Sequence, residues 1–309
     1  MRRIFGLADW PAEVRAPVLA LGTFDGVHLG HRRVIGVAVE RARARGGPAA
    51  ALTFEPHPLE VLRPGREPVL LSTIEERLEQ FASLGLDAAL VLPFDNAFSR
   101  ISAAAWLGEV LRGRLDAREI VAGSSYTFGF RREGTARQFE AWGREADIAV
   151  HLVPAVLMGG EPVSSSRIRA ALREGLVDDA GRLLGRRYRL GGRVIPGEGR
   201  GRTIGVPTAN VAVEPRKIVP AHGVYATVAT LRGRRYGGAT NIGIRPTFGG
   251  GGVSVETFLL DFDGDCAGET MTLEFARRVR DERAFPDAAA LTRQITADVA
   301  VVRQLLAEG

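Results

Sequence analysis

A short apolar run that leads through a glycine-containing turn into a helical pattern constrains this chain more than any other feature. Residues 18–21 form the apolar run and predict a buried strand, and the pattern from about residue 30 to residue 41 predicts a helix. A strand, a turn and a helix in this order present free backbone N–H groups to an anion such as phosphate. Gly30 lets the backbone approach a ligand closely, because no Cβ stands in the way.

Two histidines flank Leu29 and Gly30 on this turn. His28 and His31 are three residues apart at the start of the predicted helix, so their side chains can point in the same direction. Two imidazoles that face one spot can stabilise charge that develops on a phosphate under attack. The simpler alternative is a surface turn with incidental histidines, although two of the chain's five histidines lie here. A metal site is less favoured, because no third ligand stands at suitable spacing on this element.

The first half of the chain alternates strand-like and helix-like segments. Apolar runs predict strands at 18–21, 49–54, 88–92, 119–122 and 148–153, and amphipathic patterns predict helices at 30–41, 73–84, 102–112 and 136–146. Such alternation predicts a parallel sheet with helices on both faces. Ligands of these sheets bind beyond the carboxyl ends of the strands. We therefore expect the chemistry in the loops that follow the strands, at 22–31, 55–58, 93–99 and 123–135.

The pattern changes near residues 183–188. Glycine-rich turns and alternating apolar runs follow, and the runs at 224–231, 253–262 and 271–275 predict strands. Short strands with many turns indicate a small antiparallel barrel. An amphipathic pattern from about residue 286 to residue 306 predicts a C-terminal helix.

Composition excludes several classes of protein. The net charge of +5 is too small to indicate nucleic-acid binding by itself, and arginine supplies nearly all of the positive charge. Cys266 is the only cysteine, which excludes an intramolecular disulfide and fits a reducing cytosol. No run has the length of a membrane span or of a signal-peptide core. We therefore expect a cytoplasmic protein with small-molecule substrates and with no nucleic-acid or membrane partner.

The residues of the first turn resemble a known signature. Residues 22–31 are Gly-Thr-Phe-Asp-Gly-Val-His-Leu-Gly-His, which is similar to the His-x-Gly-His signature of nucleotidyltransferases and most of all to bacterial bifunctional riboflavin kinase/FAD synthetase. The resemblance implies a nucleotidyltransferase-type, Rossmann-like domain that adenylylates FMN, with His28 and His31 as catalytic residues. It also implies that four turn residues bind ATP or its phosphates, namely Gly22, Phe24, Asp25 and Gly30.

The loop after the fourth predicted strand resembles the same family with one departure. The family pattern Gly-x-(Asp or Asn)-(Phe or Trp)-x-Phe-Gly is matched at Gly123, Phe128 and Gly129, but Ser125 stands where Asp or Asn is expected. The resemblance implies that Ser125 contacts the nucleotide or flavin. One hydroxyl forms fewer hydrogen bonds than an amide, so we expect adenylylation that works but is slow.

Three serines precede a predicted helix at residues 168–172. Serines in this place indicate a helix cap, and any capped helix can have them. The segment also resembles the family's Ser-Ser-Thr-x-Ile-Arg. That resemblance implies that Ser165, Ser166 and Arg169 hold the β and γ phosphates of ATP at the helix N-terminus.

The second half carries its own set of motifs. Glycines permit a tight loop close to a phosphate, and Thr208 and Asn210 have short oxygen-bearing side chains of the kind that Mg²⁺ accepts. The segment resembles the riboflavin kinase signature Gly-Phe-Pro-Thr-Ala-Asn, with Val206 in place of Phe. The resemblance implies that Glu256 is the catalytic base, although a solvent-facing strand residue is the simpler alternative. It implies flavin or ATP binding by residues of the glycine-rich loop and the C-terminal motif, namely Gly197, Gly201, Gly205, Pro207, Thr208, Asn210, Arg280 and Glu282.

These resemblances cover nearly the whole chain and imply two enzymes. Residues 1–184 would adenylylate FMN to FAD, and residues 185–309 would phosphorylate riboflavin to FMN, with ATP as co-substrate and Mg²⁺ bound by Thr208 and Asn210. One alternative is a riboflavin kinase with weakened or lost adenylylation. Another is a nucleotide- or RNA-binding protein on the same fold. The sequence gives no prediction of the oligomeric state.

Overall fold

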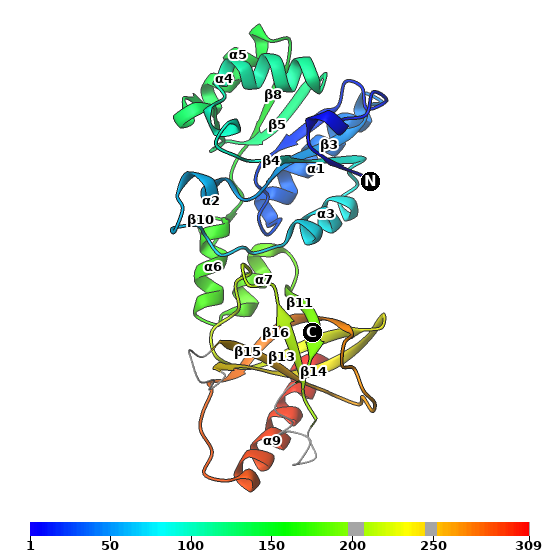
Figure 1. The fold of residues 1–309 in the computed structure, drawn as a ribbon, viewed down its shortest axis with the longest axis vertical. Helices are drawn as coiled ribbons and strands as arrows, with labels where there is room; N and C mark the ends of the chain where they lie inside the picture. Colours follow the sequence, from blue (N-terminus) through cyan, green and yellow to red (C-terminus); the bar gives the residue numbers. More distant parts are fainter. Residues whose placement is uncertain (197–206, 245–251, 309) are drawn as a thin grey trace. The chain divides into compact units, whose positions relative to one another are not determined.

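The structure is a computed structural model that describes residues 1–196, 207–244 and 252–308. The chain packs as two compact units, Met1–Ser165 and Ser166–Gly309 (Figure 1). The first unit is built on a parallel sheet, and the second is built on a closed barrel. This confirms the fold class expected from the sequence.

Six parallel strands form the sheet of the first unit, in the order β1-β4-β3-β2-β5-β8. Their bounds are β1 Arg2–Phe5, β2 Val18–Leu21, β3 Ala49–Glu55, β4 Ala88–Pro93, β5 Glu119–Gly123 and β8 Ala149–Val153. The five predicted strands are confirmed. Strand β1 was not predicted, because its four residues include two arginines and only Ile4 is buried.

Helical segments connect these strands. Their bounds are α1 Leu29–Ala44, α2 Pro58–Leu62, α3 Ile74–Ser83, α4 Ala103–Ala105 and α5 Ala136–Glu145. The helix predicted at 102–112 is α-helical only in α4, and it continues as a π-helix over Trp106–Arg114. Three short 3-10 turns lie at Leu7–Asp9, Phe98–Arg100 and Phe130–Arg132. Two small antiparallel pairs are β6 Thr127–Phe128 with β7 Gly134–Thr135, and β9 Leu157–Met158 with β10 Glu161–Pro162.

Side chains on the two faces of the sheet enter two separate cores. Leu19 and Leu21 of β2 join a core with α5 and the π-helix, whereas Val18 and Ala20 join a core with α1 and α3. This alternation follows from the period of two in a strand. Both faces of the sheet are therefore covered, which explains why continuous apolar runs marked the strands in the sequence.

A buried acid lies at the amino-terminal edge of the sheet, away from the loops that follow the strands. Glu119 begins β5 and accepts hydrogen bonds from Arg41, and from Arg45 at 2.9 Å. Its Oε2 also lies 2.7 Å from His151 Nε2. Burial raises the pKa of the Glu119 carboxyl, but the hydrogen bonds outweigh burial and lower this pKa to about 2. The cluster joins the C-terminal end of α1 to β5 and β8.

Six antiparallel strands close the barrel of the second unit, in the order β11-β12-β15-β14-β13-β16, with β16 paired back to β11. Their bounds are β11 Tyr188–Ile195, β12 Ala209–Val213, β13 Gly223–Leu231, β14 Arg234–Ile244, β15 Val253–Leu259 and β16 Thr270–Arg280. The helices within the described residues of this half are α6 Ser165–Arg173, α7 Val177–Leu184 and α9 Ala288–Ala307. The three strands and the C-terminal helix predicted in this half are confirmed, although β15 ends earlier and β16 ends later than predicted.

Glycines inside the barrel strands allow neighbouring backbones to approach. A Cβ added at Gly192 of β11 would lie 1.9 Å from the carbonyl oxygen of Ala212, and one at Gly238 of β14 would lie 2.6 Å from Thr227 Oγ1. These positions exclude any side chain, so glycine there permits close packing rather than a turn. Strands β11 and β14 were not predicted for this reason.

Helices α6 and α7 pack with the barrel. Arg278 of β16 donates a hydrogen bond to the carbonyl of Glu174 at 3.2 Å, and the backbone N–H of Ala221 donates to the carbonyl of Leu172 at 3.0 Å. Helix α9 packs against β13, β14 and β16, and its Val302 is fully buried.

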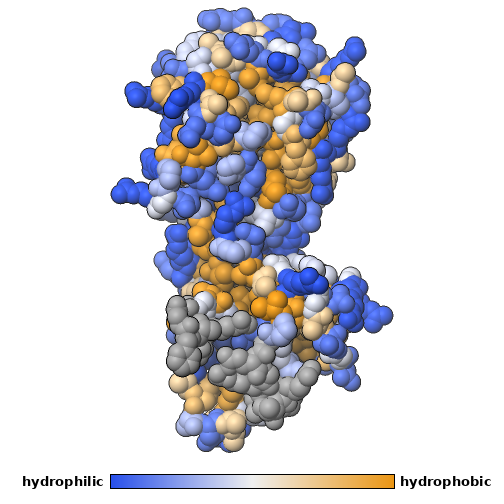
Figure 2. All heavy atoms as spheres, viewed as in Figure 1, coloured by the Kyte–Doolittle hydropathy of each residue, from blue (hydrophilic) through white to orange (hydrophobic). Residues whose placement is uncertain are grey.

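In the described part of the chain, few large apolar side chains are more than half exposed. Figure 2 shows hydrophobic residues among hydrophilic ones on the face in view. Among the residues that the structure describes, Phe5, Leu157 and Ile244 are the most exposed of the large aliphatic and aromatic side chains, and they come from different elements. Among residues 1–196, 207–244 and 252–308, no helix combines the length and the apolar character needed to cross a membrane.

Candidate functional site

The first candidate site lies where the strand order of the parallel sheet reverses. The chain runs outward from β2 to β3 and β4, and it then returns to place β5 on the other side of β2. Loops that follow β2 and β5 diverge at such a point and leave a crevice beyond the carboxyl ends of the strands. Two of the four loops in which we expected chemistry, 22–31 and 123–135, follow these two strands.

His28 caps the helix that follows this turn. It precedes α1 with extended backbone angles, and its Nδ1 accepts a hydrogen bond from the backbone N–H of His31 at 3.3 Å. The two imidazole rings stack with their centroids 3.6 Å apart and an interplanar angle of 16°. The structure therefore brings the two predicted imidazoles together. Because Nδ1 of His28 accepts this bond, a neutral ring has its N–H at Nε2.

Glycine makes room for the rings of this turn. A Cβ at Gly30 would lie 3.1 Å from Cε1 and 3.2 Å from Nδ1 of His28, and a Cβ at Gly22 would lie 3.1 Å from the Phe24 ring. Phe24 in turn meets His31 edge to face, with centroids 5.3 Å apart. The two glycines thus permit the packing that fixes the imidazoles, in addition to leaving backbone accessible.

Asp25 is buried and turns its carboxylate toward protein groups. Oδ1 accepts hydrogen bonds at 3.0 Å from the backbone N–H groups of Leu71 and Ser72, and Ser72 Oγ donates to it at 3.3 Å. The hydroxyl of Ser72 also accepts the N–H of Gly26 at 2.8 Å. These bonds hold the middle of the turn against the residues that precede α3. Burial of a carboxylate requires such partners.

Arg77 is a residue of this site that the sequence did not single out. It lies on α3, is 1% exposed, and reaches the segments at the carboxyl ends of β2 and β3. Its Nη1 donates to the carbonyl of Thr23 at 3.1 Å. Nothing in the sequence distinguishes Arg77 from the many other arginines, because two of its four acceptors are backbone carbonyls and the other two lie more than twenty residues away in the chain.

The loop after β5 exposes the residue that departs from the family pattern. The N–H of Tyr126 donates to the carbonyl of Gly123 at 2.9 Å, which closes a turn with the exposed Ser125 near its tip. Gly129 has a φ of 75°, and a Cβ there would lie 2.7 Å from the backbone nitrogen of Ala103. Phe128 packs on Phe139 with ring centroids 4.5 Å apart. The matched residues of this loop therefore shape it, and Ser125 faces solvent, as Ser124 and Thr127 also do.

The serine cluster lies at the start of α6. Ser165 Oγ donates to the carbonyl of Asp25 at 2.9 Å, so this serine is fixed to the first turn. Ser166 and Arg169 follow on α6, where Ser166 is exposed and Arg169 is buried. The first residue of α6 is thus bonded to the backbone of the histidine turn.

The second candidate site lies on neighbouring strands of the barrel. Residue pairing places Asn210 of β12 opposite Glu256 of β15, and Glu256 opposite Asn241 of β14. Paired residues have their side chains on the same face of a sheet. Thr208 Oγ1 donates to Glu256 Oε2 at 3.4 Å. The structure therefore gathers Thr208, Asn210 and Glu256 in one place, and it adds Asn241.

The two residues of the C-terminal motif have different surroundings. Arg280 donates to the buried carboxylate of Asp298 from Nε at 3.0 Å and from Nη2 at 2.7 Å, so it ties β16 to α9. Glu282 lies against β14, because a Cβ at Gly243 would be 2.2 Å from Glu282 Oε1. Gly243 is two residues from Asn241, so the glutamate lies near the polar cluster of the barrel. Arg280 therefore has a structural bond that the sequence did not predict.

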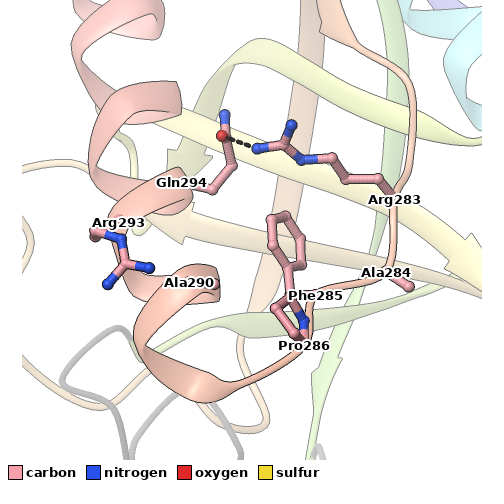
Figure 3. A pocket seen from close by; sticks show the side chains of 7 residues that line it. All are labelled: Arg283, Ala284, Phe285, Pro286, Ala290, Arg293 and Gln294. Carbon is pink, nitrogen blue, oxygen red and sulfur yellow. Dashed lines mark hydrogen bonds between the residues drawn. The ribbon is translucent and has the colours of Figure 1, made fainter.

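A pocket of about 440 Å³ begins directly after Glu282 (Figure 3). The loop from Arg283 to Pro286 forms one side, and the first turns of α9 form the other. Its lining residues are Arg283, Ala284, Phe285, Pro286, Ala290, Arg293 and Gln294. Arg283 lies over the Phe285 ring at 5.0 Å and donates to Gln294. The pocket thus offers one aromatic face with guanidinium groups beside it.

Some predicted residues lie outside the described ranges. Gly197, Gly201 and Gly205 of the glycine-rich loop are among them. Pro207, directly after that loop, is described and exposed.

Comparison with known proteins assigns both halves of the chain. The family model for FAD synthetase matches residues 11–167, and the family model for riboflavin kinase matches residues 184–306. The bifunctional riboflavin kinase/FMN adenylyltransferase of Bacillus subtilis is 39% identical over 285 residues, which cover 91% of this chain and 90% of that protein. The chain belongs to the bifunctional riboflavin kinase/FMN adenylyltransferase family. The member from Pseudomonas fluorescens is 35% identical over 99% of this chain and 98% of that protein.

A solved structure shares the whole fold of this family member. It is a crystal structure described as a macrolide-efflux protein from Streptococcus pneumoniae, and it is 32% identical to this chain. It matches with a TM-score of 0.91 over 98% of this chain and 99% of that chain. Both units of this bifunctional enzyme therefore have a counterpart in a single known structure.

Proposed function

We propose that this chain phosphorylates riboflavin to FMN in the region 185–309 and adenylylates FMN to FAD in the region 1–184, with ATP as co-substrate in both steps. The observation that carries the proposal is the occurrence of two separate polar centres in one family member. The stacked pair His28 and His31 lies at the strand reversal of the sheet. Thr208, Asn210 and Glu256 lie together on the barrel. Small-molecule chemistry of this kind suits the cytoplasm, where we place the protein.

In the kinase step, the ribityl 5′-hydroxyl of riboflavin attacks the γ-phosphate of ATP and ADP leaves. Glu256 is the general base that takes the hydroxyl proton. Its partly exposed carboxylate and its hydrogen bond from Thr208 keep it at the surface of the barrel, within reach of a bound substrate. Glu282 and the glycine-rich loop bind flavin or ATP, and Arg280 keeps β16 and α9 in place behind them.

The same cluster fits a magnesium ion. Thr208 Oγ1 and the Glu256 carboxylate are 3.4 Å apart, and Asn210 stands opposite Glu256 on the adjacent strand. Hydroxyl, amide and carboxylate oxygens are the donors that Mg²⁺ prefers. Thr208 and Asn210 would hold the ion, which neutralises phosphate charge when it is bound.

In the adenylylation step, the phosphate of FMN attacks the α-phosphate of ATP and pyrophosphate leaves. A phosphate monoester is already ionised at neutral pH, so the step needs charge neutralisation and alignment rather than a strong base. His28 offers Nε2–H as a donor, because its Nδ1 is used by the helix cap. Gly22, Phe24, Asp25 and Gly30 shape the turn. Ser165, Ser166 and Arg169 at the start of α6 bind the β and γ phosphates.

Ser125 supports a second version of the proposal, in which adenylylation is slow. Its hydroxyl is exposed at the tip of the loop after β5, where an amide would form an additional hydrogen bond. A nucleotide- or RNA-binding protein without either activity is not favoured by the matches to two enzyme families.

Incubation of the full chain with riboflavin, ATP and Mg²⁺ tests the proposal, with FMN and FAD separated by chromatography. We expect both products. His28→Ala or His31→Ala should stop FAD formation and leave FMN formation intact. FMN without FAD in the wild-type protein would support the kinase alone, and neither product would refute the proposed function.

A further inference from the structure

We propose that Arg77 is a positioning residue of the adenylyltransferase site, which holds the turn after β2 in the conformation that places His28 and His31. The inference rests on the proposed adenylylation of FMN. Arg77 comes from α3 and touches neither imidazole in any described contact. It acts through the backbone of the turn.

The side chain of Arg77 connects the ends of two neighbouring strands. Its Nη1 lies 3.1 Å from each of three acceptors, the carbonyls of Thr23 and Phe54 and the hydroxyl of Thr53. Its Nη2 pairs with Glu55 Oε2 at 2.7 Å. A guanidinium suits these acceptors, because its donors are fixed in a planar fork. One residue therefore fixes the start of the histidine turn to the end of β3.

The energetics of burial favour a specific role for this charge. Arg77 is 1% exposed, whereas its only anionic partner, Glu55, has a side chain that is 25% exposed. The remaining acceptors of Arg77 are neutral. Burial of a guanidinium is costly, and a well-packed apolar side chain often stabilises a fold as well or better. A buried arginine with mostly neutral acceptors is therefore better explained by the conformation that it specifies than by stability.

The fixed carbonyl lies next to a strained residue. Thr23 accepts hydrogen bonds from Arg77 and from Thr53 Oγ1, the latter at 2.9 Å. The following residue, Phe24, has a φ of 51°, which is unfavourable for a bulky side chain and persists only when the surroundings impose it. The Phe24 ring packs edge to face on His31. Without the hydrogen bond from Arg77 to Thr23, the backbone of Phe24 could leave its strained conformation, and the contact of its ring with His31 would move.

The segment that precedes α3 also forms hydrogen bonds to the same turn. Ser72 lies just before α3 and bonds both Asp25 and Gly26. Arg77 and Ser72, which are close together in the chain, thus form hydrogen bonds to the turn at two different points. Asp25 holds the middle of the turn even when Arg77 is changed, so we expect a displaced turn rather than an unfolded one.

Kinetics of FAD formation test the proposal in the full-length protein. A displacement of about 1 Å at a reacting group can cost about 100-fold in rate. We expect Arg77→Ala to lower kcat about 100-fold and Arg77→Lys about 10-fold. Thr53→Val, which removes one bond to Thr23, should lower kcat less than either. The KM values for FMN and ATP should change by less than about threefold, because the phosphate-binding groups remain. Formation of FMN from riboflavin provides an internal control and should be unchanged.

Glu119→Gln is the matched control for a general loss of stability. It breaks a buried charge cluster at the opposite edge of the same sheet, and it should leave kcat for FAD formation unchanged. If Glu119→Gln lowers kcat as much as Arg77→Lys, the positioning role is refuted. Wild-type kcat in both Arg77→Lys and Thr53→Val also refutes it. If Arg77→Ala does not fold, these two milder variants decide the question.

Side-chain NMR of the histidines adds a measurement that does not depend on activity. In Arg77→Lys without substrates, the ring signals of His28 and His31 should shift, while those of His222 in the second unit should not. Unchanged ring signals for His28 and His31 would overturn the proposal. A wild-type protein that makes no FAD would refute the proposed function instead, and the ring signals would still test the hold of Arg77 on the turn.

Discussion

Substitution of Gly30 by alanine separates the stability of helix α1 from the geometry of the histidine turn. Gly30 lies in the first turn of α1, and its φ is not in the left-handed region. Alanine is favoured over glycine in a helix by about 0.5–1 kcal/mol. From helix propensity alone, Gly30→Ala should therefore stabilise the first unit.

The contacts at Gly30 predict the opposite effect on catalysis. The new Cβ would lie 3.1 Å from Cε1 and 3.2 Å from Nδ1 of His28, closer than the usual contact of about 3.5–4.0 Å between carbon atoms. The His28 ring must therefore move by a few tenths of an ångström, which weakens its cap on His31 N. A net hydrogen bond contributes about 0.5–1.5 kcal/mol, so loss of the cap offsets the propensity gain. We expect an almost unchanged melting temperature and a decrease of about 10- to 100-fold in FAD formation.

Gly36→Ala is the matched control on the same helix. A Cβ at Gly36 meets no atom within 4 Å, so this variant should gain the full propensity term and keep its activity. For a unit of this size, the gain should raise the melting temperature by about 2–4 °C per kcal/mol. Calorimetry and steady-state FAD synthesis measure the two effects. Wild-type FAD formation in Gly30→Ala would contradict the claim that the position of the His28 ring governs the reaction.

Four further predictions follow from the two sites and their supports. Glu256→Gln should reduce FMN formation by about 10²–10⁴-fold, while FAD formation from supplied FMN persists; an undiminished kinase rate in the riboflavin assay would make Glu256 only a strand residue. Ser125→Asn should raise FAD formation about three- to thirtyfold at saturating FMN and ATP and leave FMN formation unchanged. If FAD formation does not rise, Ser125 does not weaken the adenylylation site. The pKa of Glu119 is lowered from 4.5 to about 2 in the folded state, so its stabilisation is present above pH 4.5 and is lost as the pH falls toward 2. In urea unfolding, the free energy of unfolding should fall by at most about 3 kcal/mol over this pH window. Solvent at the partly exposed arginines reduces this loss, and the loss should be absent in Glu119→Gln. A fragment of residues 166–309 should make FMN but no FAD. It should have a higher melting temperature than a fragment of residues 185–309, which lacks α6 and α7. Equal melting temperatures would show that these helices do not stabilise the barrel.

The sequence was most informative where one local rule decides the structure. The run before Gly22 and the helical pattern after Gly30 predicted β2 and α1, because a buried parallel strand is apolar on both faces. The pair His28 and His31 could be predicted as neighbours from helical spacing alone. The observed stacking and the cap needed the structure, since they depend on the ring orientation of His28.

The sequence was least informative where the neighbour of a residue is far away in the chain. Gly192 and Gly238 look like turn residues, but the opposite strand of the barrel requires the absence of a side chain there. The sequence places Asp25 at a phosphate and does not single out Arg77, whereas in the structure both bind backbone groups on distant segments. Backbone donors and acceptors leave no mark in a sequence, so these roles could not be predicted.

The closure of the barrel has a consequence for the order of events during synthesis of the chain. Strand β11 begins at Tyr188 but must pair with β16, which ends at Arg280, whereas the last strand of the parallel sheet ends at Val153. At about 5–20 residues per second, a ribosome completes β16 about 6–25 s after it completes the sheet. The first unit can therefore fold before β16, the strand that closes the barrel of the second unit, has been synthesised. The edges of β11 and β13 that pair with β16 have unpaired backbone groups in that interval, so we expect a nascent chain of this protein to be most prone to aggregation and proteolysis late in its translation.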